Sequence, residues 1–156
     1  MPGAIHRYLS GDHARLDALL ARAADGDATA YEEFRAGLLR HIAMEEKVLF
    51  ADGRKRPELA AMIARLHADH AALASLLVPP PTPSILRTAR EILDEHNSIE
   101  EREGGLYEAC ESLPGADEDT LLARMTALPA VRVAQHVDEP RIHEHIARML
   151  AARGRT

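Results

Sequence analysis

Two short stretches of the chain place histidine and glutamate where they could bind a metal ion. In "RHIAMEEKVLF", His41 and Glu45 stand four residues apart inside an otherwise apolar run, and "EHNSIEEREGGLY" repeats this spacing with His96 and Glu100. A four-residue step in an α-helix leaves two side chains about 40° apart and one turn along the axis. Each pair can therefore direct an imidazole nitrogen and a carboxylate oxygen towards the same point.

Two further histidines, His13 and His70, lie in the middle of apolar stripes with helical spacing. A buried carboxylate is costly without a positive partner, and no Lys or Arg lies on these stripes. A bound cation would supply that charge, and imidazoles with carboxylates are suitable ligands for a transition metal. The predicted ligands are His13, His41, Glu45, His70, His96 and Glu100. Six ligands exceed one tetrahedral zinc ion, whereas carboxylates that bridge suit two iron or manganese ions.

The elements that must position these ligands are four helices. The first is expected from about Ser10 to Ala24, and the second begins after a cap at Asp27 or Thr29 and ends near Gly53. The third begins around residue 57 and the fourth at residue 84, after the rigid connector "VPPPTPS". Helix-forming residues dominate and the connections are short. The sequence therefore predicts an all-α fold, an antiparallel up-down four-helix bundle.

The chain beyond the fourth helix has a different character. "ADEDTLLARMTAL" is typical of a short amphipathic helix, "PAVRVAQHV" of an extended segment, and "DEPRIHEHIARMLAARG" of a last helix between Asp138 as cap and Gly154 as stop. We therefore expect a bundle of residues 1–112 and a C-terminal helical extension, residues 113–156, packed on its outside.

Composition narrows the class of partner. The net charge is -6 with His neutral, so a basic nucleic-acid footprint is absent and no nucleic-acid partner is expected. No segment approaches the length of a transmembrane helix or resembles a signal peptide, so we expect no membrane partner. One cysteine, Cys110, fits a reducing compartment, which favours a cytoplasmic location. The expected assembly is a monomer or homodimer.

The order of His13, "HIAMEE", "DHAAL" at His70 and "HNSIEE" resembles the hemerythrin family, specifically its bacterial HHE cation-binding branch, over about residues 1–110. The resemblance implies a four-helix bundle with two iron ions, bridged by carboxylates and by an oxo or hydroxo group. It implies that the four histidines are terminal ligands and that Glu45 and Glu100 are the bridges. It also implies an open iron position for a small ligand such as O2, NO or H2O2.

Two positions depart from the oxygen-carrying members of that family. Those members have a second histidine on the third helix, four residues before the one that matches His70, and here Leu66 stands at that position. His67 lies next to it and is a further candidate ligand, since three residues separate it from His70. Their carboxylate on the fourth helix matches Glu101, but the HHE branch uses the spacing of Glu100, which we therefore favour.

Several other polar residues are expected to lie outside the centre. Glu46 and Glu101 stand one residue beyond the predicted ligands and would face solvent or support a ligand. Tyr31 and Tyr107 are expected to be packing or boundary residues, and Cys110 to act as a small buried hydrophobe. The remaining histidines are expected near a helix start or on the surface, and they are His6, His136, His143 and His145.

Three functions suit such a centre. The first is a non-haem di-iron protein that binds O2 or NO for sensing, scavenging or carriage. The second is a di-iron oxidoreductase acting on peroxide or NO, and the third is iron storage or donation to damaged iron–sulfur clusters. No GxGxxG, P-loop or CxxC motif is present, and no reductase domain is evident, which favours a metal- and gas-binding protein over a multi-turnover enzyme.

Overall fold

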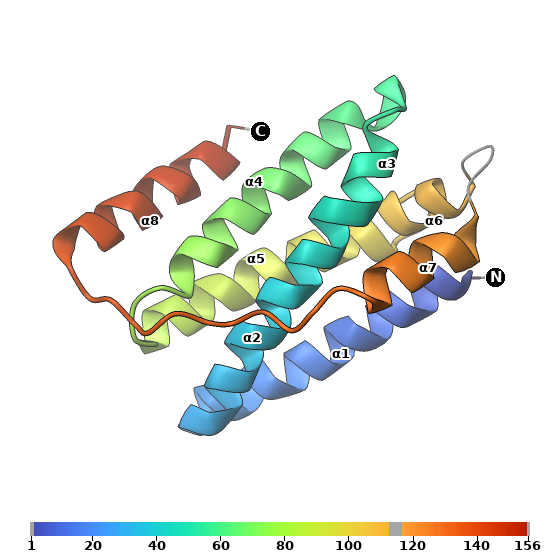
Figure 1. The fold of residues 1–156 in the computed structure, drawn as a ribbon. Helices are drawn as coiled ribbons and strands as arrows, with labels where there is room; N and C mark the ends of the chain where they lie inside the picture. The colour runs from blue at the N-terminus through green and yellow to red at the C-terminus, as the bar shows by residue number, and fades with distance from the viewer. Residues whose placement is uncertain (1, 113–116, 156) are drawn as a thin grey trace.

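The computed structural model describes residues 2–112 and 117–155, and these two segments contain helices and no strand (Figure 1). Four long helices form the body of the molecule: α1 (Ala4–Ala24), α2 (Ala28–Met44), α4 (Ala60–Leu76) and α5 (Pro83–Glu101). They run antiparallel in succession, with α1 packed against α2 and α5, and α4 packed against α5. The predicted all-α, up-down four-helix bundle is confirmed. None of the described helices is long and apolar enough to span a membrane.

The second helix changes its geometry where the ligand glutamate begins. α2 continues without a break into a π-helix, η1 (Glu45–Phe50), and then into a last short turn, α3 (Ala51–Gly53). Its start is capped by Asp27, whose carboxylate accepts the Ala30 N–H at 2.9 Å, so Thr29 lies inside the helix. A π-helical turn holds one more residue than an α-turn and is frequent at functional sites.

The first helix begins earlier than predicted, at Ala4 instead of near Ser10. Carboxylates from distant parts of the chain accept its first free N–H groups: Glu118 accepts that of Ile5 at 3.2 Å, and Glu111 accepts that of His6 at 3.0 Å. Helix ends need such partners. A local capping pattern in the sequence cannot reveal Glu111 and Glu118, because both lie more than 100 residues from the start of the helix.

The third and fourth helices start as expected. A 3-10 turn, η2 (Pro57–Leu59), leads into α4, and the Thr82 side chain caps α5. The fourth helix, however, ends at Glu101, since Gly104 adopts a φ of +73° that favours glycine. A separate short helix, α6 (Leu106–Glu111), follows, and Cys110 lies on it.

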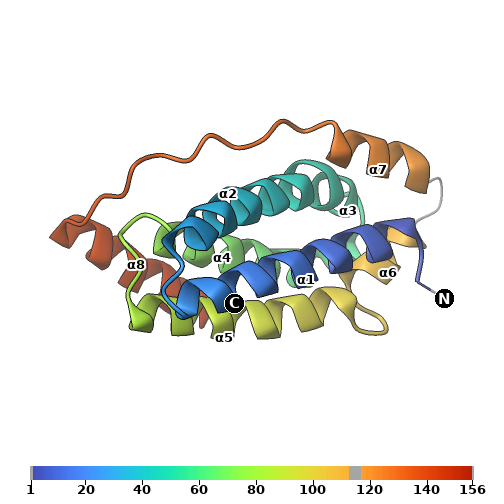
Figure 2. The same ribbon diagram turned by 90° about the horizontal axis from the view of Figure 1, so that it is seen from below.

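The tail wraps around the bundle. α7 (Glu118–Thr126) lies over α1 and η1, and residues 129–139 then run extended across the outside of α2 (Figure 2). Buried Arg35 donates to the Leu77 and Ala134 carbonyls, which ties this extended segment to the α4–α5 connection. The last helix, α8 (Pro140–Arg153), packs along α4.

One expectation about the tail is corrected by the structure, and another remains untested. Glu139, and not Asp138, is the N-cap residue of α8, and Asp138 instead accepts a hydrogen bond from His143. The proposed division between residues 1–112 and 113–156 falls beside residues 113–116, which lie outside the described residues. That division stays a prediction.

The apolar core consists of two clusters separated by a polar layer. One cluster contains residues such as Leu16, Phe34, Leu73 and Ile92, and the other contains residues such as Leu9, Leu49, Leu66 and Leu106. On each of the four long helices the predicted ligand histidine lies between the parts that pack in the two clusters. The aliphatic core therefore holds the polar layer in place from both sides.

Candidate metal centre

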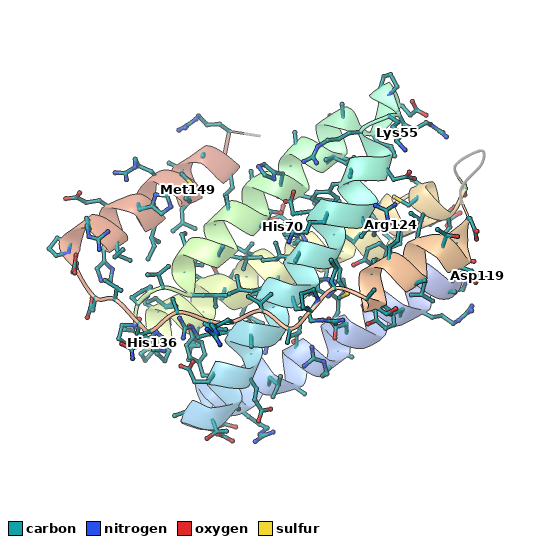
Figure 3. All side chains as sticks on the ribbon, in the orientation of Figure 1. Lys55, His70, Asp119, Arg124, His136 and Met149 are labelled. Carbon is teal, nitrogen blue, oxygen red and sulfur yellow. The ribbon has the colours of Figure 1, made fainter. Side chains whose placement is uncertain are left out.

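The six predicted ligands meet inside the bundle. Their side chains are between 0% and 7% exposed, and they come from α1, η1 and each of the other three long helices. Glu45, His70, His96 and Glu100 offer ligand atoms within 4.8 Å of one another, and His13, His41 and Glu100 form a second such group. Figure 3 shows His70 near the middle of the bundle, between α4 and α2. Glu100 belongs to both groups, as a bridging carboxylate would.

The Nε2 atoms of the four histidines all face this cluster. His41 Nε2 lies 3.0 Å from Glu45 Oε1, and His96 Nε2 lies 2.8 Å from Glu100 Oε1. His13 Nε2 and His41 Nε2 face each other at 3.1 Å. The atoms His70 Nε2, Glu45 Oε1 and Glu100 Oε1 are buried without a hydrogen-bond partner.

The opposite nitrogen of every histidine faces a carboxylate. Each Nδ1–H donates to one oxygen, at 2.8 Å for three of the histidines and 3.1 Å for His96. The pairs are His13 with Glu101, His41 with Asp12, His70 with Glu46, and His96 with Asp69. Since a carboxylate only accepts, each Nδ1 carries a proton, and Nε2 is the nitrogen through which each histidine can bind a metal.

These four carboxylates repeat in the two halves of the chain. Asp12 precedes His13 and Asp69 precedes His70, while a glutamate follows each predicted bridge. Within each half, the aspartate of the first helix supports the histidine of the second, and the glutamates support histidines of the other half. The sequence analysis missed Asp12 and Asp69, although the two "DH" dipeptides are a signal of the repeat.

An aromatic ring stacks on one histidine in each half. Phe50 lies parallel to His70 at 5.2 Å between ring centroids, and Tyr107 stacks on His13 at 5.8 Å. Tyr107 is fully buried, and its hydroxyl lies 2.8 Å from Glu100 Oε2 and 3.1 Å from Glu45 Oε2. Tyr107 is therefore a packing residue, one of the two expected alternatives, but its hydroxyl also lies among the predicted ligand atoms. It lies seven residues after Glu100, a helical spacing, but the Gly104–Gly105 break concealed its approach to the cluster.

The charges of the cluster call for a cation. Burial lowers the pKa of His41 and of His96, but the charges of Glu45 and Glu100 outweigh this effect and raise both pKa values to about 10. Burial raises the pKa of Tyr107 well above its ordinary value, and the same two carboxylates add to that rise. Among the described residues, no Lys or Arg pairs with Glu45 or Glu100. The donor set fits a metal cation, which would supply the positive charge that the field favours.

Apart from Tyr107, the residues expected outside the cluster lie outside it, and so does the candidate ligand His67. His67 is 60% exposed and donates to Glu46, and His6 contacts the Glu101 carbonyl. Cys110 is buried, as predicted, and burial raises the pKa of its thiol to about 12. The tail histidines, His136, His143 and His145, lie at or near the surface.

Comparison with known proteins agrees with this geometry. The family model described as hemerythrin HHE cation-binding domain matches residues 4–103, which include all six predicted ligands and the four supporting carboxylates. No curated protein and no solved structure matched the chain. The match covers well over half of the chain, so the chain belongs to the hemerythrin HHE cation-binding domain family.

Proposed function

We propose that this protein is a non-haem di-iron protein whose centre binds a small ligand, O2 or NO, in sensing, scavenging or carriage. The proposed ligands are His13, His41, Glu45, His70, His96 and Glu100. Two ions fit this set better than one, because the six residues form two groups of ligand atoms, and Glu100 belongs to both groups. Carboxylates from bundle helices commonly hold a pair of iron or manganese ions, and the high share of imidazole together with family membership favours iron.

The observation that carries this proposal is a cavity beside the cluster. It has a volume of about 20 Å³, and the four histidines and Glu45 are among the residues that line it. Leucines from all four long helices, Leu16, Leu38, Leu73 and Leu93, also line it. Such a space holds about one water-sized molecule. A diatomic gas fits its size, and the aliphatic side chains suit an apolar molecule.

The same cavity weighs against iron storage. A store needs room for many ions, whereas the leucines and the tight Nε2 cluster leave space for one small molecule. The chain's own residues exclude bulk water from the centre, and the Nδ1–H groups of the four histidines donate to Asp12, Glu46, Asp69 and Glu101, which fixes the orientation of each ring. Iron, when bound, would supply an open coordination position and a change of oxidation state.

The first expected result concerns the metal itself. Protein purified under air should contain about two iron ions per chain and absorb in the near ultraviolet as an oxo-bridged diferric pair does. Metal analysis and the optical spectrum, recorded before and after anaerobic reduction and again after adding NO or O2, provide the check. A single tightly held zinc ion, with no uptake of iron by the metal-free protein, would contradict the proposal.

A second expected result concerns the support of His96. Asp69 is fully buried, and its Oδ2 accepts the Nδ1–H of His96. The substitution Asp69→Asn removes the charge that orients and strengthens this imidazole, and we expect metal affinity to fall by about 10–100-fold with unchanged stoichiometry at saturation. The matched control is Glu95→Gln, because the Glu95 carboxylate pairs with the same two arginines as Asp69 but does not accept a hydrogen bond from the His96 ring. Equal affinities for the two variants would show that Asp69 does not act on the centre.

A further inference from the structure

The two halves of the centre have different aromatic rings stacked on a histidine, and only one of these rings carries a hydroxyl group. Phe50 stacks on His70 in one half, and Tyr107 stacks on His13 in the other. Phe50 and Tyr107 are both fully buried, so each ring fills a comparable place in the core. Only the Tyr107 ring carries a hydroxyl, and that hydroxyl points at the ligand atoms. The repeat of the ligands is therefore nearly symmetric, and Tyr107 breaks the symmetry.

The Tyr107 hydroxyl faces more acceptors than its one proton can serve. Its oxygen lies 2.8 Å from Glu100 Oε2, 3.1 Å from Glu45 Oε2 and 3.1 Å from His13 Nε2. The Nδ1–H of His13 donates to Glu101, so Nε2 is the nitrogen that can bind a metal once it carries no proton. The one O–H of Tyr107 can donate to only one of the two carboxylates at a time. The contact with the other carboxylate brings lone pairs together in a buried space, unless a cation lies among them.

The distances among these atoms are those of neighbouring donors around one ion. In an octahedral site with bonds of about 2.1 Å, adjacent donors lie about 3.0 Å apart. Tyr107 Oη, His13 Nε2 and Glu100 Oε2 are separated by 3.1, 2.8 and 3.2 Å, which forms one nearly equilateral triangle. His41 Nε2 lies a further 3.1 Å from His13 Nε2.

We propose that Tyr107 is a seventh ligand, whose phenolate oxygen binds the ion held by His13, His41 and Glu100, so that the two ions of the centre are inequivalent. This inference rests on the proposed di-iron function. On binding, the Tyr107 O–H bond breaks, an oxygen–iron bond forms and one proton leaves to solvent, with no change in oxidation state. Ligands that must lose a proton release it on metal binding, and tyrosine is an established ligand of ferric iron in haem proteins.

The test uses the full-length protein loaded with ferric iron. A phenolate bound to ferric iron gives a broad visible charge-transfer band, and laser excitation into that band enhances the ring vibrations of the bound tyrosine. We expect both signals in the native protein and their complete loss in Tyr107→Phe. The matched control is Tyr31→Phe, which removes the hydroxyl of another buried tyrosine far from the ligands and should leave both signals unchanged.

Two further measurements keep the inference decidable. Mössbauer spectra of protein loaded with iron-57 should show two different iron sites in the native protein and two similar ones in Tyr107→Phe. If that variant does not fold, native protein grown on ring-deuterated tyrosine decides, because only bound tyrosine shifts its enhanced vibrations. Two bound iron ions without any tyrosine signal would overturn this inference and leave the proposed function standing. Absence of iron uptake by the native protein would overturn both.

Discussion

Replacing Glu45 with alanine should remove at least one of the two metal ions. Glu45 is fully buried, and its Oε1 lies 3.0 Å from His41 Nε2 and 3.4 Å from His70 Nε2, so it faces ligands from two helices. In the proposed di-iron centre a carboxylate in this position would serve both ions, whereas a methyl group offers neither a donor atom nor a negative charge. The measurement is metal content per folded chain after loading with excess iron, with helix content checked by circular dichroism.

Glu46 provides the matched control for Glu45. It is adjacent in the sequence, but it is 22% exposed and accepts hydrogen bonds from His67 and from His70 Nδ1, on the outer side of that ring. Glu46→Ala should keep two ions at saturating iron and lower the affinity by about 10–100-fold. The comparison must therefore be one of stoichiometry. If both variants lose ions equally, the inward face of this helix has been misassigned.

Removing the His70 imidazole should also cause the centre to lose one or both metal ions, whereas removing the His67 imidazole should not. His70 is 3% exposed, and its Nε2 faces Glu45, so alanine deletes a donor and leaves a gap in a buried cluster. His67, at 60% exposure, donates from Nδ1 to Glu46 and can be hydrated without penalty. We expect His70→Ala to lose iron and His67→Ala to retain both ions and nearly the native spectrum. A metal-depleted His67→Ala protein would mean that a fifth imidazole belongs to the centre.

The bundle and the cluster follow from patterns that act within single helices. The four-residue step from His41 to Glu45 places both side chains on one face wherever the helix lies, and the same holds for His96 and Glu100. Apolar neighbours at helical spacing identify that face as the buried one. These local rules were sufficient to predict the helical bundle and to select the six residues that the structure brings together.

Residues whose role depends on a neighbouring helix could not be found in this way. Asp12 precedes His13 and so points about 100° away from the inward face, which reads as outward when one helix is considered alone. Only the packing of α1 against α2 turns it into the partner of His41. Tyr107 was missed for a related reason, since two glycines interrupt the helix and tertiary packing returns the ring to the cluster. The π-helix at Glu45–Phe50 likewise has no local signal.

The last helix shares a carboxylate with the centre. Asp69 accepts from His96 through Oδ2 and from Arg153 of α8 through Oδ1, at 2.8 Å. Because one charge serves both partners, the free energy of docking α8 and the free energy of metal binding are not independent. Thermodynamic reciprocity then requires that α8 changes metal affinity by the same factor by which metal changes the docking of α8. The helix α8 lies beyond residues 4–103, the part that the family model matches. Any change that separates α8 from α4 should therefore alter the hydrogen bond between Asp69 and His96, and with it the metal affinity.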